Sequence, residues 1–128
     1  MKKRRIGKFL LIVALFLVVV IVGAYALMNR NLGKLAESSI ENVDVTVLSD
    51  GEYLGRYRVL PVIVELKVTV KNHAIESIQL LRHDNGQGKM AEKIVDDVIA
   101  QQRIDVDSVA GATYSSKVIL KAIEAALK

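Results

Sequence analysis

The sequence has no cysteine, one proline and two histidines among its 128 residues. Without cysteine the protein can form no disulfide bond, no thiolate metal site and no cysteine nucleophile. A lipid anchor on a cysteine is excluded as well, so any attachment to a membrane must come from the polypeptide itself. His73 and His83 have neither a second histidine at helical spacing nor a cysteine beside them, and the sequence therefore predicts no metal site.

Acidic residues are absent before Glu37, which concentrates the positive charge at one end of the chain. The formal net charge is +4, but residues 29–128 carry 13 basic and all 14 acidic residues, a net charge of −1. The excess belongs to a basic tail, residues 1–8, which contains Lys2, Lys3, Arg4, Arg5 and Lys8. No basic surface interleaved with aromatic residues remains, so we expect no nucleic-acid partner.

The basic tail is followed by an uncharged, almost entirely apolar run, Phe9–Met28. As a helix, its 20 residues would reach about 30 Å, the thickness of one bilayer core. The sequence therefore predicts one transmembrane anchor at residues 9–28. Because basic residues lie on its N-terminal side, we expect a single-pass protein of the cell membrane with a cytoplasmic N-terminus and an extracytoplasmic C-terminal domain.

Other interpretations of the apolar run are available. Ala24-Tyr25-Ala26 fits a small-residue cleavage site, so the run can also be a signal peptide. A helix buried in a soluble core is less favoured, because such a helix would normally show a polar face. Residues 29–43 are predicted to be a juxtamembrane linker with a short amphipathic helix. The apolar positions of that helix are Leu32, Leu35, Ala36 and Ile40.

Residues 44–128 are predicted to form one α+β domain, in which a small antiparallel sheet packs against two or more helices. Apolar and polar residues alternate in the strand segments, and asparagine at position 72 suits a tight turn at Lys71–Ala74. The predicted strands are Val45–Leu48, Glu52–Leu60, Val62–Val70 and Ile75–Arg82. The predicted amphipathic helices are Met90–Gln102 and Val118–Lys128.

Two polar stretches interrupt these elements. Arg82–Lys89 is predicted to be a loop with two glycines, and Asp107–Lys117 lies directly before the last helix. The second stretch combines Gly111 with the hydroxyl groups of Thr113, Ser115 and Ser116. The first N–H groups of a helix have no intrahelical partner and the helix dipole is positive there, so a phosphate would bind well. An ordinary turn at Gly111 followed by a serine N-cap is the alternative.

The second stretch also carries a recognisable residue order. It contains Asp107-x-x-Ala110-Gly111-Ala112-Thr113-Tyr114-Ser115-Ser116. A shorter motif, Asp50-Gly51-x-Tyr53-x-Gly55, opens the predicted domain. Over residues 45–128 the chain resembles the FMN-binding domain family, which includes flavoprotein subunits of the sodium-pumping NADH:quinone reductase and of the Rnf electron-transfer complex. The chain departs from the family at Ala110, where serine or threonine is usual.

The resemblance implies FMN as the cofactor, held through its phosphate. Thr113 would accept a phosphoester bond that a separate flavin transferase makes, and the backbone of Gly111 and Ala112 would surround the phosphate. Ser115 and Ser116 would cap the helix and bond the phosphate. The remaining family positions are Ala110 and Tyr114 within the motif, Asp107 for metal-assisted recognition by the transferase, and His83 in a loop near the flavin.

The resemblance further implies an electron carrier whose partners are the membrane, the flavin transferase, and redox proteins or a quinone. The alternative is a module that binds FMN or another anionic ligand without a covalent bond. Ala110 favours this alternative, because it lacks the hydroxyl group that is usual in the family at this position. A hydrolase built on Ser115 or Ser116 with His83 is a third possibility, although the chain has no G-x-S-x-G elbow.

Overall fold

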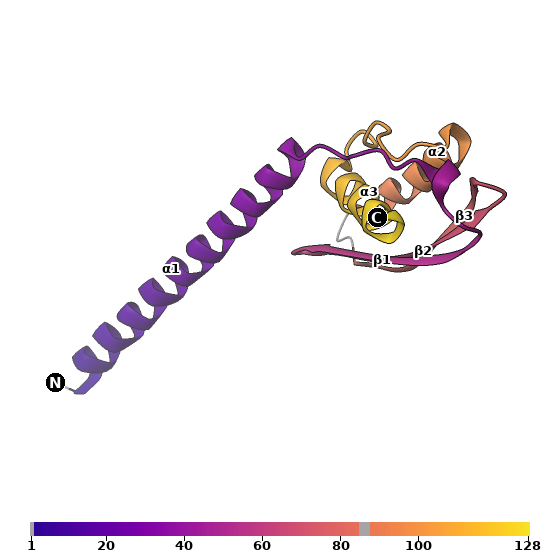
Figure 1. Cartoon of the computed structure of the whole chain (residues 1–128). Coiled ribbons are helices and arrows are strands. Elements are labelled where there is room, and N and C mark those ends of the chain that lie inside the picture. The colour runs from indigo at the N-terminus through magenta and orange to yellow at the C-terminus, as the bar shows by residue number, and fades with distance from the viewer. Residues whose placement is uncertain (1, 85–87) are drawn as a thin grey trace. The chain divides into compact units, whose positions relative to one another are not determined.

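The computed structural model describes residues 2–84 and 88–128. By its contacts the chain divides into two units, Met1–Asn31 and Leu32–Lys128. The elements in chain order are helix α1 Lys2–Glu37, 3₁₀ helix η1 Val45–Val47, strands β1 Gly51–Val59, β2 Val62–Lys71 and β3 Ala74–Asp84, 3₁₀ helix η2 Gly88–Lys93, and helices α2 Ile94–Gln101 and α3 Thr113–Leu127. Figure 1 shows these elements along the chain.

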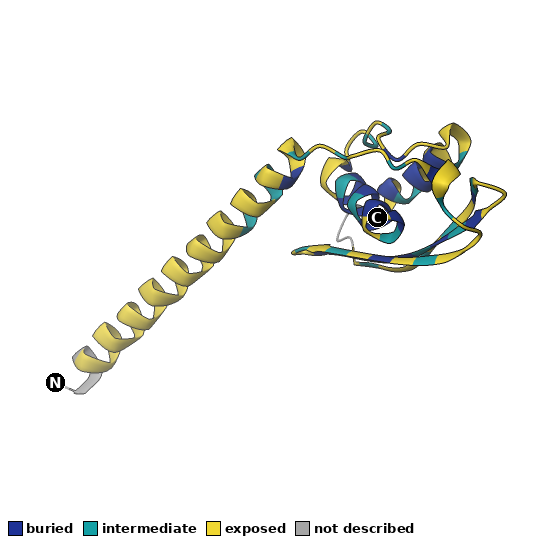
Figure 2. Ribbon diagram, viewed as in Figure 1, coloured by how far each residue is buried: buried dark blue, intermediate teal, exposed yellow. Residues whose placement is uncertain are grey.

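The N-terminal helix α1 is one candidate membrane span. Within its segment Arg5–Glu37, an 18-residue stretch has a mean hydropathy of 3.1, so the helix is long and apolar enough to cross a bilayer. Residues 5–27 of this helix are all exposed, and Figure 2 shows its ribbon coloured as exposed over this length, which is unlike a helix of a soluble core. The helix continues through Asn29–Gly33, so the short helix expected in residues 29–43 is the last part of α1 itself.

Three antiparallel strands form the sheet, in the order β1-β2-β3. In β2 the alternation is complete: Val62, Val64, Leu66, Val68 and Val70 are buried. The turn between β2 and β3 has positive φ angles at Asn72 (51°) and His73 (61°), as a two-residue hairpin turn of type I′ requires. The predicted tight turn at Lys71–Ala74 and the α+β fold are confirmed.

One predicted strand does not form, and the end of another strand is predicted wrongly. Val45–Val47 forms a 3₁₀ helix and no strand, because Asp44 caps it by accepting hydrogen bonds from the backbone N–H and the hydroxyl of Thr46. At the other end, β3 continues to Asp84, so Arg82, His83 and Asp84 belong to a strand and only part of the predicted Arg82–Lys89 loop remains. Residues 85–87 of that loop lie outside the described residues.

The stretch predicted as one helix, Met90–Gln102, is a 3₁₀ helix followed by a short α-helix. The expected apolar positions are nevertheless buried, among them Ala91, Ile94 and Val98. Helix α2 ends at Gln101, and the next residue, Gln102, has a left-handed φ of 52°. The Gln102 side chain accepts a hydrogen bond from the N–H of Ile75 at 2.7 Å and donates one to the C=O of Ile75 at 2.9 Å. These two bonds fix the end of α2 against β3.

Helix α3 and its neighbours cover one face of the sheet, as Figure 1 shows. The fit of α3 on β1 depends on Gly55. A Cβ atom at this position would collide with the backbone oxygen of Ala122 and lie 2.8 Å from the Cβ of Ala126. The helix backbone therefore approaches the strand more closely than a side chain would permit, and the core forms between the sheet and this helical layer.

Glu124 of α3 is buried, although its place in the sequence pattern predicts a solvent-facing side chain. Its carboxylate accepts hydrogen bonds from Lys121 at 2.9 Å and from Lys128 at 2.7 Å. Burial raises the pKa of the Glu124 carboxyl, but the two lysine hydrogen bonds and charges lower it more, so its pKa lies below the ordinary value. The folded protein thus prefers the charged form of this group.

Stability should consequently depend on pH through Glu124. A depressed folded pKa adds stability above the unfolded-state pKa, and this contribution is lost as pH falls through the folded pKa. We expect Glu124→Gln to lower the free energy of unfolding by about 1–3 kcal/mol at neutral pH. The deficit should shrink as pH falls below the ordinary glutamate range. Denaturant unfolding at several pH values measures this, with Glu76→Gln as the control, since Glu76 is exposed and 3.7 Å from Lys71.

Candidate functional site

The residues before α3 form a tight turn. The N–H of Ala112 donates to the C=O of Val109 at 3.0 Å, which closes a four-residue turn over Ala110 and Gly111. Gly111 has a φ of +79°, the conformation that the third position of a type II turn requires. Ala110 and Gly111 are exposed at the tip of this turn, whereas Ala112 is 7% exposed.

Helix α3 begins at Thr113, five residues earlier than the predicted start at Val118. The first intrahelical bond runs from the N–H of Ser116 to the C=O of Ala112 at 2.9 Å. The N–H groups of the first turn, at Thr113, Tyr114 and Ser115, precede it and have no acceptor in the helix. Ala112 is the N-cap and makes no side-chain hydrogen bond, so these donors stay available to an anion.

The prediction that Ser115 or Ser116 caps the helix is wrong. Both residues lie inside the helix and are buried, at 4% and 0% exposure. The hydroxyl of Ser116 accepts a hydrogen bond from the N–H of Val109 at 3.0 Å, so it holds the turn against the helix. A buried hydroxyl engaged in this way is also a poor nucleophile, and this removes the support for a hydrolase based on Ser116.

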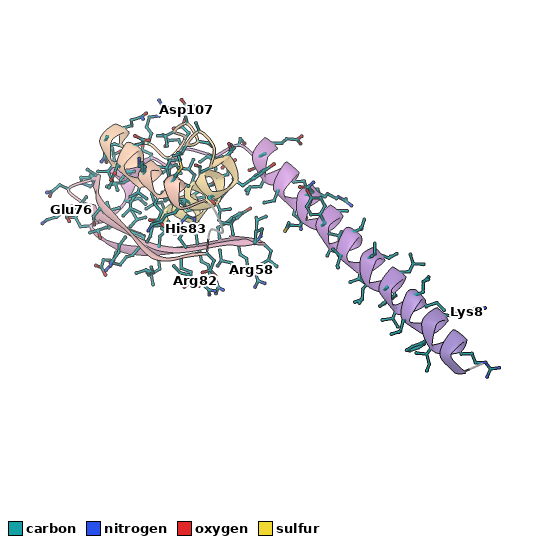
Figure 3. All side chains as sticks on the ribbon, turned by 180° about the vertical axis from the view of Figure 1, so that it is seen from behind. Lys8, Arg58, Glu76, Arg82, His83 and Asp107 are labelled. Carbon is teal, nitrogen blue, oxygen red and sulfur yellow. The ribbon has the colours of Figure 1, made fainter. Side chains whose placement is uncertain are left out.

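Thr113 and Tyr114 occupy the surface of the first helical turn. Thr113 is exposed, and Tyr114 is 43% exposed. Asp107 is also exposed, and Figure 3 shows it on the side of the helical layer away from the sheet. The structure therefore brings together, at one end of α3, the turn tip, Thr113 and the N–H groups that have no acceptor in the helix.

His83 is placed differently from the expected loop residue. It lies on β3 opposite Val64, and its side chain is 3% exposed. Its Nδ1 is 2.9 Å from a carboxylate oxygen of Glu92 in η2, and Figure 3 shows it between the sheet and the helices. Because β2 and β3 pair in this register, His83 points to the same face as the apolar core residues. The interpretation of His83 as a solvent-exposed loop residue is therefore wrong.

The donor set at the start of α3 suits a phosphate group. Backbone N–H groups without an acceptor in the helix, a positive helix end and an adjacent hydroxyl suit a phosphate monoester or diester. Gly111 adds a tip without a side chain, where a Cβ atom would have no neighbour within 4 Å. The comparison with known families agrees with this geometry: the FMN-binding domain family matches residues 62–128, more than half of the chain.

The chain belongs to the FMN-binding domain family. FMN is accordingly its cofactor. The donors at the start of α3 are of the kind that bind a phosphate group. The match includes β2, β3 and all the helices after them, whereas β1 and its Asp50-Gly51-x-Tyr53-x-Gly55 motif precede it. Neither a curated protein nor a solved structure matches the chain at a significant level.

Gly111 offers a direct test of the turn. Gly111→Ala meets no atom within 4 Å, so any cost comes from placing a side chain at a φ of +79°. We expect the free energy of unfolding to fall by about 1–2 kcal/mol and FMN binding to weaken, because the turn and the first N–H groups move together. Denaturant unfolding and FMN titration measure the two effects. Gly33→Ala in α1 is the control, since a Cβ atom there also meets no atom within 4 Å and the residue is helical.

Proposed function

We propose that this chain is a membrane-anchored flavoprotein that carries electrons outside the cytoplasm, with FMN joined to Thr113 by a phosphoester bond. The supporting observation is that the exposed Thr113 hydroxyl lies on the first turn of α3, beside N–H groups that have no acceptor in the helix. Bound FMN supplies the one- and two-electron chemistry, and the protein supplies the phosphate site and the anchor.

The roles of the other residues follow from their positions. The exposed turn tip of Ala110 and Gly111 allows a phosphate to approach the backbone of Ala112. The N–H groups of Tyr114 and Ser115 donate to the phosphate oxygens, and Ser116 keeps the turn closed. Asp107 is available for the flavin transferase, and buried His83 supports the flavin site from β3.

The attachment step replaces the hydroxyl proton of Thr113 with the FMN phosphoryl group. A bond forms between Oγ of Thr113 and phosphorus as the bond from that phosphorus to the leaving group of an activated flavin phosphate donor breaks, and the leaving group departs with the hydroxyl proton. The chain therefore gains the mass of FMN less one water. A separate flavin transferase performs the step, as the family resemblance implies. Electron partners are redox proteins or a quinone, and the basic tail before the apolar run favours a cytoplasmic N-terminus.

A second candidate is a module that binds FMN without a covalent bond. The observation in its favour is Ala110, which places a methyl group at the exposed tip of the turn where the family usually has a hydroxyl. The remaining donors at the helix start would bind FMN in either case.

Intact mass spectrometry of the full chain, coexpressed with a flavin transferase, separates the two candidates. A mass gain of one FMN less water, with flavin fluorescence on a denaturing gel, supports the carrier. Yellow folded protein that releases all its flavin on denaturation supports the non-covalent module. Protein that is colourless when folded and carries no flavin when denatured would contradict both candidates.

A further inference from the structure

Lys117 lies on the same face of α3 as Thr113. The two residues are four positions apart, so their side chains are neighbours on the helix surface. Side chains in a helix point back toward its N-terminus, so the Lys117 stem extends over the turn that begins at Thr113. Lys117 is also the only basic residue in the sequence Thr113–Leu120, the first two turns of α3. It is therefore the cation nearest in sequence to the phosphate site.

The ammonium group of Lys117 is held by a backbone carbonyl. Its Nζ donates a hydrogen bond to the C=O of Ser38 at 2.8 Å. Ser38 directly follows α1, and both its N–H and its hydroxyl bond the C=O of Leu35, at 3.1 and 2.7 Å. Because the C-terminal end of a helix is negative, a cation is favourable at this position. Lys117 thus links the last turn of α1 with the first turns of α3.

The segment after α1 is itself attached to the domain. Leu35 is 4% exposed and belongs to the core. The side chain of Asn42 accepts a hydrogen bond from the N–H of Ile104 at 3.1 Å, and Glu41 pairs with Lys128. These contacts lie within the unit Leu32–Lys128, so the carbonyl of Ser38 is a fixed point to which Lys117 is bonded.

We propose that Lys117 binds the flavin phosphate at Thr113 and shares its donors between the phosphate and the Ser38 carbonyl. An ammonium group has three N–H donors, and the Ser38 carbonyl occupies one of them. A phosphate held at the first turn of α3 accepts the others as charge-assisted hydrogen bonds. This inference rests on the proposed function, since it names a further residue of the same site. Lys121 and Lys128 do not serve this role, because both pair with Glu124.

The test compares FMN with riboflavin, which has the same ring system and no phosphate. The full chain in detergent carries Thr113→Val, so that only non-covalent binding is measured, and flavin fluorescence gives the dissociation constants. We expect Lys117→Met to weaken FMN binding about tenfold and to leave riboflavin binding unchanged. Lys117→Arg should retain most of the FMN affinity. Lys71→Met is the matched control, because Lys71 is exposed and pairs with Glu76.

The outcomes separate a phosphate contact from a structural one. Equal weakening of FMN and riboflavin by Lys117→Met would mean that the lysine only supports the fold, and would overturn the inference. Unchanged binding of both would overturn it as well. If the chain bound neither compound before Lys117 was changed, the proposed function itself would fail, and this inference with it.

Discussion

Replacement of Thr113 by valine is expected to abolish covalent flavin attachment, because the phosphoester needs the Thr113 hydroxyl and valine keeps the shape of the side chain without it. Thr113 is exposed at the first position of α3, so the change should alter the melting temperature by no more than a few degrees. Intact mass after coexpression with a flavin transferase should show the unmodified chain alone, and the denaturing gel should show no flavin fluorescence.

Two companion variants make this result specific. Thr69→Val removes a hydroxyl from β2, away from the phosphate site, and should leave the mass gain unchanged. Ala110→Ser restores the hydroxyl that the family usually has at the turn tip, and should raise the modified fraction. A flavin mass gain that persisted in Thr113→Val would place the attachment on another residue and contradict the role assigned to Thr113.

Replacement of Gly55 by alanine is expected to destabilise this domain more than replacement of Gly51 or Gly111 by alanine. The new Cβ would collide with the backbone oxygen of Ala122 and lie 2.8 Å from the Cβ of Ala126. Neither neighbour is the flexible end of a long side chain, so relief requires α3 to move away from β1. We expect a loss of about 3 kcal/mol or more in the free energy of unfolding.

For a domain of about 100 residues, this loss corresponds to a fall in melting temperature of roughly 12–24 °C. Tyrosine fluorescence of the full chain in detergent measures it, since Tyr53 and Tyr57 lie on either side of Gly55 in β1. Gly51→Ala is the matched control, because its Cβ would meet only the Tyr53 ring, at 4.0 Å. Equal melting temperatures for the two variants would contradict the close approach of α3 to β1.

The same variant connects the fold with function. The first turn of α3 is the proposed phosphate site and its later residues pack on Gly55, so a shift of the helix also moves the N–H groups at Thr113 and Tyr114. FMN affinity should therefore fall together with stability in Gly55→Ala. The Thr113 variant, in contrast, should lose covalent flavin while its melting temperature stays nearly unchanged.

Some features were predictable from the sequence because they depend on neighbouring residues alone. The two-residue period of Val62–Val70 determines which side chains of β2 are buried, and Asn72 allows the left-handed turn that follows. The apolar run after the basic tail predicts a candidate span without reference to other elements. The family is likewise evident from the sequence, since the match to the FMN-binding domain family covers residues 62–128.

Other features depend on contacts between residues far apart in the chain, and only the tertiary structure decided them. His83 is buried because β3 extends to Asp84 and pairs it with the core face of β2. Glu124 is buried because two lysines of its own helix satisfy its charge while the helix packs on the sheet.

The site itself shows the same division. The sequence by itself determined the residue types of the proposed phosphate site: a glycine at the turn and a hydroxyl group at Thr113. The tertiary structure decided that α3 starts at Thr113, that Ser116 closes the turn, and that Lys117 reaches the Ser38 carbonyl. The physical reason is that the start of a helix depends on hydrogen bonds to residues outside the helix. Here Val109 bonds Ala112 and Ser116, and Ser38, in the segment after α1, bonds Lys117.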